Sequence, residues 1–308
     1  MGGDSLPSIL CRRYKGAALL GAALFLANGA VFADDVADKA PPPGVWDWSG
    51  FYIGAGGSFN STHFDQSLQG VSGTINVFDG AVPIAKGQEG GPSFDFNRNK
   101  LGFAPDAQLG YMAPFANGDW LAGLKFTYKY ANIDSTEIVT IPQTGTGTRL
   151  AGPGAPSTGP ITGFVQGSAE INLKHQLSLI ATIGHAFDNM TVYAGGGPAL
   201  FNVDTNFNGT PFATAPVGTF PASLPLTVLN KNWVWGGAAQ VGTTYAFAPG
   251  WFLDFSYTFA RSANFSIENS VFVRNQIGSL TVSGPAVLNT QERVTNQSVM
   301  LTLNYQFH

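Results

Sequence analysis

The histidines and acidic residues of the sequence offer one short candidate for metal binding. His63 and Asp65 are separated by a single residue. Both side chains are common zinc ligands, but a site needs three or four ligands, and no further candidate stands near this pair. The glycines 195–197 are not followed by the Lys-Ser/Thr of a phosphate-binding loop. We therefore expect neither a metal site nor a cofactor.

A second group of charged residues lies in segments that alternate between apolar and polar side chains. Because strand side chains alternate between two faces, these residues share a face that is polar throughout. If the apolar face meets lipid, the charges line an enclosed interior, where they must be paired. A turn near Ala116 would place Asp106 opposite Lys125 or its neighbour. The predicted interior charges are Asp106, Lys125, Lys129, Lys174 and Asp254.

Two interpretations of these charges stay open. They could be an ion-pair network that fills the interior, with Asp254 reaching Lys125 or Lys129 across it. They could instead form the charged lining of a channel that selects solutes. A barrel of eight strands has room for little beyond its own side chains, which favours the ion-pair network.

Eight segments show the alternating pattern, and each is long enough to cross a bilayer as a tilted strand. The clearest are 120–133 and 296–307; the others are 48–59, 100–112, 170–185, 190–203, 233–247 and 251–259. Short turns alternate with long polar connections at 60–98, 135–167, 204–230 and 266–295, which we expect to be mobile extracellular loops. This rhythm predicts an all-β fold, an eight-stranded antiparallel up-and-down transmembrane β-barrel. Trp48, Trp120, Trp251 and Tyr305 would form an aromatic girdle at its periplasmic end.

The N-terminus has the outline of a secretory signal. Arg12, Arg13 and Lys15 precede an apolar run, 16–33, that ends in a small-x-small pattern. We expect a signal peptide over 1–33, a proline-rich periplasmic leader over 34–47 and the barrel over 48–308. The less favoured alternative is a single membrane-spanning helix. A formal net charge of −4 argues against nucleic acid as a partner, and few charged residues (11%) beside many aromatic ones (13%) suit a membrane barrel.

One family combines these features. The signal, the leader, Trp-Ser-Gly-Phe-Tyr-Ile-Gly at 48–54 and an alternating last strand resemble the small outer-membrane β-barrel proteins of the "porin family" or outer-membrane immunogenic protein type. Their architecture is similar to that of eight-stranded opacity-type barrels. The resemblance implies the outer membrane of a Gram-negative bacterium and an assembly signal at Tyr305 and Phe307, read by the barrel-assembly machinery. Members usually end on the aromatic residue, whereas here His308 follows.

The expected function is structural. Lipid-A deacylases of the outer membrane carry a His-x-Ser pair, and none of the four histidines has a serine two residues later. We therefore expect a non-enzymatic monomer that supports the envelope, contacts outer-membrane lipid and lipopolysaccharide, and offers its loops as a surface antigen and to a possible extracellular ligand. The alternatives are a narrow channel for small solutes and, less favoured, a lipid-modifying enzyme.

Overall fold

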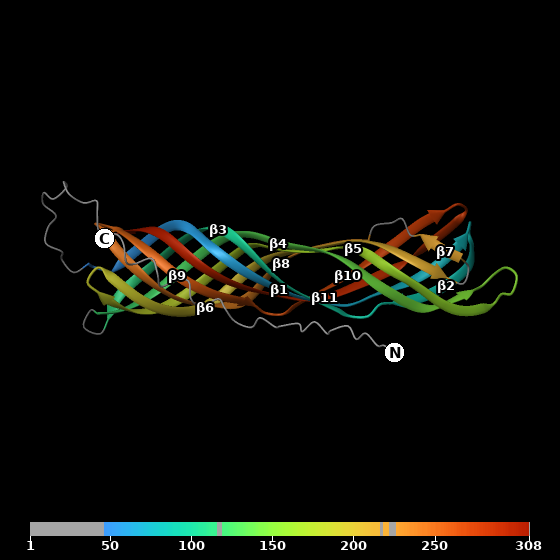
Figure 1. Cartoon of the computed structure of the whole chain (residues 1–308), viewed down its shortest axis with the longest axis horizontal. Coiled ribbons are helices and arrows are strands. Elements are labelled where there is room, and N and C mark those ends of the chain that lie inside the picture. The colour runs from blue at the N-terminus through green and yellow to red at the C-terminus, as the bar shows by residue number, and fades with distance from the viewer. Residues whose placement is uncertain (1–45, 116–118, 216–217, 222–225, 308) are drawn as a thin grey trace, which may run out of the picture. The chain divides into compact units, whose positions relative to one another are not determined.

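The computed structural model describes residues 46–115, 119–215, 218–221 and 226–307, and every regular element in these ranges is a β-strand. No helix that could cross a membrane occurs among them. The predicted signal and nearly all of the predicted leader lie outside the described residues. The strands are β1 (Gly50–Asp79), β2 (Val82–Gly90), β3 (Phe94–Phe115), β4 (Trp120–Arg149), β5 (Ser157–Phe187), β6 (Met190–Ala215), β7 (Gly218–Pro221), β8 (Leu226–Ala248), β9 (Trp251–Ser262), β10 (Phe265–Ile277) and β11 (Leu280–Phe307) (Figure 1).

Eight of these strands close into an antiparallel ring. The order around the ring is β1, β3, β4, β5, β6, β8, β9 and β11, and β11 pairs with β1 so that Phe51 lies opposite Phe307. Closure matters because an unpaired backbone group in lipid costs several kcal/mol. The predicted eight-stranded antiparallel barrel is confirmed.

The two ends of the ring differ. One end, the short-turn end, holds the Phe51–Phe307 pair and the tight connections 188–189 and 249–250. The other, the far end, carries β2, β7 and β10 (Figure 1). These extra strands pair with continuations of the ring strands, β2 with β1 and β4, β7 with β6, and β10 with β11.

The expectation of irregular loops at the far end was wrong. β1 continues to Asp79, β4 to Arg149, and β11 begins already at Leu280. Alternation persists in these segments, but its apolar residues now point inward: Val139, Ile141 and Val165 are buried. The polar residues between them face outward, which made the segments look like loops.

Two bulges mark the level at which the alternation reverses. The β4–β5 ladder shifts register between Tyr130 and Ile133, where Asn132 has a φ of 44°, and the β5–β6 ladder shifts between Leu173 and His175. A bulge adds one residue to a strand and so moves the following side chains to the other face. Ile133 and Leu173 are therefore buried. In the sequence of 170–185, Ile171 and Leu173 alternate in phase with Leu177 and Leu179, which predicts all four on the outer face, but Ile171 and Leu173 lie inside.

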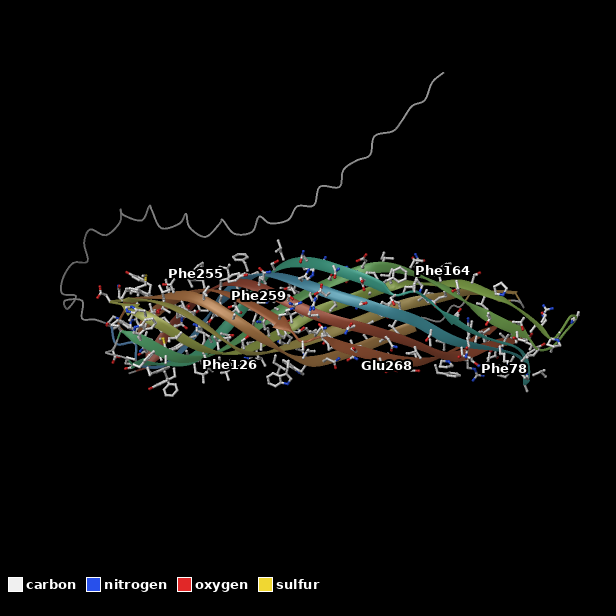
Figure 2. All side chains as sticks on the ribbon, turned by 90° about the horizontal axis from the view of Figure 1, so that it is seen from below. Phe78, Phe126, Phe164, Phe255, Phe259 and Glu268 are labelled. Atoms are coloured by element: carbon white, nitrogen blue, oxygen red, sulfur yellow. The ribbon has the colours of Figure 1, made fainter. Side chains whose placement is uncertain are left out.

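Apolar side chains cover the outside of the half next to the short-turn end. On β9 every second residue from Trp251 to Phe259 is exposed, and on β11 the same holds from Val299 to Phe307. Phe126, Phe255 and Phe259 lie in this half, and Phe78, Phe164 and Glu268 in the other (Figure 2). An outward apolar band with a polar interior is the pattern of strands that face lipid.

Candidate functional site in the barrel interior

The residues before β1 close the short-turn end of the barrel. Trp48 is only 3% exposed and packs edge-on against Phe252, with ring centroids 5.8 Å apart. Its indole nitrogen donates to the carbonyl oxygen of Asp188, 3.3 Å away. Gln306 donates to the carbonyl oxygens of Asp47 and Ser49 at 3.0 and 2.8 Å, which ties this segment to the last strand. Trp48 therefore fills the mouth of the barrel, and its predicted place in the aromatic girdle was wrong.

Above this closure, Asp254 is the centre of a buried polar group. Its side chain is 1% exposed, and its Oδ2 lies 2.5 Å from Lys125 Nζ. Tyr193 donates to Asp254 Oδ1 at 2.7 Å, and Gln108 donates to Oδ2 at 3.0 Å. Lys125 also donates to the hydroxyl oxygen of Tyr193 at 2.6 Å. The buried Asp254 carboxylate is thus paired with one cation, Lys125, and accepts hydrogen bonds from two neutral donors, Tyr193 and Gln108. Neither Tyr193 nor Gln108 was predicted from the sequence as a partner of Asp254.

A second ion pair lies on β3 and β4. Lys129 Nζ is 3.2 Å from Asp106 Oδ1 and donates to the Ser58 hydroxyl. Asp106 lies opposite Lys129 in the ladder rather than opposite Lys125 or its neighbour. The expected register was wrong because Phe115 pairs with Trp120, which centres the connection between residues 117 and 118 rather than at Ala116.

Lys174, the fifth predicted interior charge, lies outside. The bulge on β5 turns its side chain outward, where it is 36% exposed and pairs with Asp204 at 2.5 Å. Its assignment to the barrel lining was wrong, because the strict alternation of the sequence is broken at this level.

Further along the interior, apolar and polar layers alternate. An apolar cluster that includes Phe64, Leu173 and Phe201 lies above the ion pairs. Glu292 follows, accepting hydrogen bonds from Gln66 (2.8 Å), Thr205 (2.7 Å) and Thr290 (3.3 Å). A second apolar cluster fills the far half, with these members: Leu68, Val139, Ile141, Val165, Ala169, Phe207, Val228 and Leu288. A cavity of about 20 Å³, lined in part by Gln66, Thr205 and Thr290, has room for roughly one water.

The other residues considered for chemistry have local partners. His63 Nε2 lies 2.8 Å from Asp65 Oδ1, and Arg293 donates to Asp65 Oδ2 at 2.6 Å. Partial burial raises the pKa of Asp65, but the hydrogen bond and charge of Arg293, with His63, outweigh it and leave this pKa lowered. Within the described ranges no three His, Cys, Asp or Glu side chains gather as a metal site would require. The glycines 195–197 lie inside β6, where a Cβ on Gly197 would come within 2.0 Å of the Leu179 carbonyl oxygen, so they allow close strand packing.

Comparison with known proteins adds to this geometry. No family model matches the chain. The chain is similar to outer membrane protein P1 of Coxiella burnetii, with 26% identity over 269 residues, 85% of this chain and 87% of that protein. The protein is an outer-membrane β-barrel protein. This outcome confirms both the resemblance to outer-membrane barrels and the predicted location in the cell outer membrane.

Solved structures similar to this outer-membrane barrel include Ail, the attachment invasion locus protein of Yersinia pestis, with 13% identity over 77% of this chain and 98% of that one (TM-score 0.25). Neisserial surface protein A shows 10% identity over 80% and 97% (TM-score 0.26). The outer membrane protease OmpT of Escherichia coli shows 10% over 81% and 97% (TM-score 0.29).

The predicted assembly signal lies at the end of β11. Tyr305 and Phe307 point outward from the short-turn end, 39% and 53% exposed, and their ring centroids are 5.1 Å apart in an edge-on arrangement. Both side chains are therefore accessible on the outside of the last strand. Their recognition by the assembly machinery stays a prediction.

Glu292 should make the far half of the barrel sensitive to pH. Burial raises its pKa, and hydrogen bonds from Thr205, Gln66 and Thr290 offset this only in part. A carboxyl whose pKa is raised on folding destabilises the fold once it ionises, so stability should fall as pH rises from the ordinary glutamate range through the raised pKa. Glu292→Gln should remove this loss. The measurement is hydrogen exchange of β10 and β11 amides between pH 4 and pH 8, corrected for intrinsic exchange rates.

The matched control for that experiment is Glu89→Gln, since burial also raises the pKa of Glu89 on β2. It should change protection near β2 and leave β10 and β11 as in the wild type. An unchanged pH dependence in the Glu292→Gln protein would contradict the assignment.

Proposed function

We propose that the protein is a non-enzymatic outer-membrane barrel with a filled interior that supports a β-structured extension on the cell surface. In this proposal the short-turn end faces the periplasm, as short turns do in such barrels, and the far end is extracellular. It is inserted as a monomer by the barrel-assembly machinery, contacts outer-membrane lipid and lipopolysaccharide, and offers the far end to an extracellular ligand.

The observation that carries this proposal is the succession of buried layers along the interior. The Trp48 cluster, the two ion pairs, the apolar cluster around Leu173, the Glu292 group and the second apolar cluster follow one another from end to end. An interior occupied in this way offers a solute no continuous aqueous path. It also gives the far-end strands an apolar core, which a structural or adhesive extension needs to stay ordered in water.

A narrow channel for small solutes is the second candidate. The two ion pairs favour it, because charges at membrane depth line selective pores in other proteins. Conduction would require both pairs to open and the apolar layers to move. A lipid-modifying activity is the weaker third candidate, and no three His, Cys, Asp or Glu side chains gather among the described residues to hold a catalytic metal ion.

Electrical recording on the purified, folded protein tests the proposal. In planar bilayers at 1 M KCl we expect no steady conductance steps, because the interior is occupied. Asp254→Asn is the matched probe of the alternative, since it removes an interior charge without changing side-chain volume. Steady wild-type steps whose ion selectivity changes in Asp254→Asn would establish a channel and refute the filled-interior proposal.

A further inference from the structure

On the neighbouring strands β8 and β9, the apolar band on the outside of the barrel is followed directly by positive charge. On β8 the outward residues Trp235 and Trp233 are followed by Lys231, and on the neighbouring β9 Phe259 is followed by Arg261. On the neighbouring strands, Asp204 of β6 lies opposite Lys231 and the neutral Thr295 of β11 lies opposite Arg261, while β5 carries a further outward cation, Lys174. Arg261 lies opposite Gly237, six residues along β8 from Lys231, so the two cations stand at the two ends of the Trp233–Trp235 pair.

The two tryptophans of this place are unusually open. Trp233 is 52% exposed and Trp235 66% exposed, and both stand on the same face of β8. His175 stacks on Trp233 with ring centroids 6.3 Å apart and an interplanar angle of 17°. Exposed indoles at the edge of an apolar band are typical of the membrane–water interface. Their flat faces are also suited to stacking against a sugar ring.

Lys231 lies near the Asp204 carboxylate, but Asp204 does not fully neutralise its charge. Asp204 lies 2.5 Å from Lys174 but 3.9 Å from Lys231, so its carboxylate is satisfied mainly by Lys174. The Lys231 side chain remains 73% exposed. For Arg261 the structure shows no ion pair among the described residues. The site therefore keeps two cations available to an outside anion, although Asp204 reduces its net charge.

The backbone at this place also has free hydrogen-bonding capacity. The β8–β9 ladder ends at Gly236 and Ser262, and β10 pairs with β11 rather than with β8. One further bond, from the Ala263 amide to the Trp235 carbonyl, closes the corner. Beyond it the β8 edge over 226–234 has no ladder partner on the β9 side within the described strands. In a stable protein, such an unpaired strand edge is normally covered or otherwise protected from pairing with another chain.

We propose that Lys231, Trp233, Trp235 and Arg261 bind the phosphorylated sugar headgroup of a lipid in the outer leaflet. The indoles stack on the sugar, the two cations pair with its phosphates, and the free edge of β8 hydrogen-bonds to its hydroxyl and amide groups. The site rests on the proposed orientation, in which the far end is extracellular. Its chemistry distinguishes it from general lipid contact, which needs only the apolar band.

Lipid binding to the folded protein in a neutral detergent tests this site. The probe is lipid A bearing both phosphates, compared with dephosphorylated lipid A and with inorganic phosphate alone. The dissociation constant is measured by native mass spectrometry or by the shift of the unfolding temperature with lipid concentration. Because a cation near an anionic headgroup contributes about a fivefold factor in affinity, Lys231→Glu with Arg261→Glu should weaken binding of the phosphorylated lipid by more than about tenfold.

The matched control is Lys86→Glu, an exposed lysine on β2 far from the site. It should bind like the wild type. Equal binding of dephosphorylated lipid A, or an equal loss in Lys86→Glu, would overturn the site. Tight binding of inorganic phosphate alone would show that the site binds a simple anion rather than the lipid headgroup. None of these readouts depends on conductance, so the test separates this proposal from that of the filled interior.

Discussion

Replacing Asp254 with alanine is expected to lower the free energy of unfolding by about 3–5 kcal/mol, because it leaves Lys125 buried without its counter-charge. Lys125 Nζ and Asp254 Oδ2 are 2.5 Å apart, and both side chains are almost fully buried. The measurement is reversible urea unfolding of the barrel in detergent micelles. The heat-induced shift in gel migration, lost on unfolding, gives an independent readout.

The control for this prediction is an ion pair of the same length outside the barrel. Lys174 and Asp204 are also 2.5 Å apart, but this pair is exposed to solvent, so Lys174→Ala should destabilise the protein far less than Asp254→Ala. The double variant Lys125→Met with Asp254→Leu should recover much of the lost stability, because it removes both buried charges together. Equal effects at the two pairs would show that the interior is hydrated, as a channel requires.

The second large effect is expected at Trp48. Replacing it with alanine should cost about 3–5 kcal/mol, since it removes a large buried side chain from the closure of the short-turn end. It also breaks the hydrogen bond from Trp48 to the Asp188 carbonyl, which links this segment to the β5–β6 turn. The same urea unfolding experiment measures the loss.

Trp251 is the matched control, because it lies at the same end of the barrel but on its outside, 40% exposed. Trp251→Ala should cost clearly less in a detergent micelle, which covers the site with apolar chains. If both variants lost the same stability, Trp48 would lie in the outer girdle as its sequence position suggested.

The sequence by itself determined the membrane-embedded ring. Strict alternation from Val299 to Phe307, and likewise on β3, β4 and β9, allows only one face to meet lipid, so it also identified Asp106, Lys125, Lys129 and Asp254 as inward residues. The alternating pattern was sufficient because the bilayer requires every strand at this depth to pair its backbone groups and to turn apolar side chains toward lipid. The number of strands and their antiparallel order followed from the same pattern.

Only the tertiary structure showed that the strands continue into the far half of the barrel, and which interior charges form ion pairs. In the far half the apolar residues turn inward, so strands such as the second half of β4 look like polar loops in the sequence. The bulges at Asn132 on β4 and Lys174 on β5, which shift the inward positions of these two strands, leave little trace in a single sequence, and the second of them moved Lys174 outside. Pairing depends on register and on contacts across the ring. Lys125 meets Asp254 from 129 positions away and Asp106 faces Lys129, because closure of the barrel, rather than local pattern, brings these side chains together.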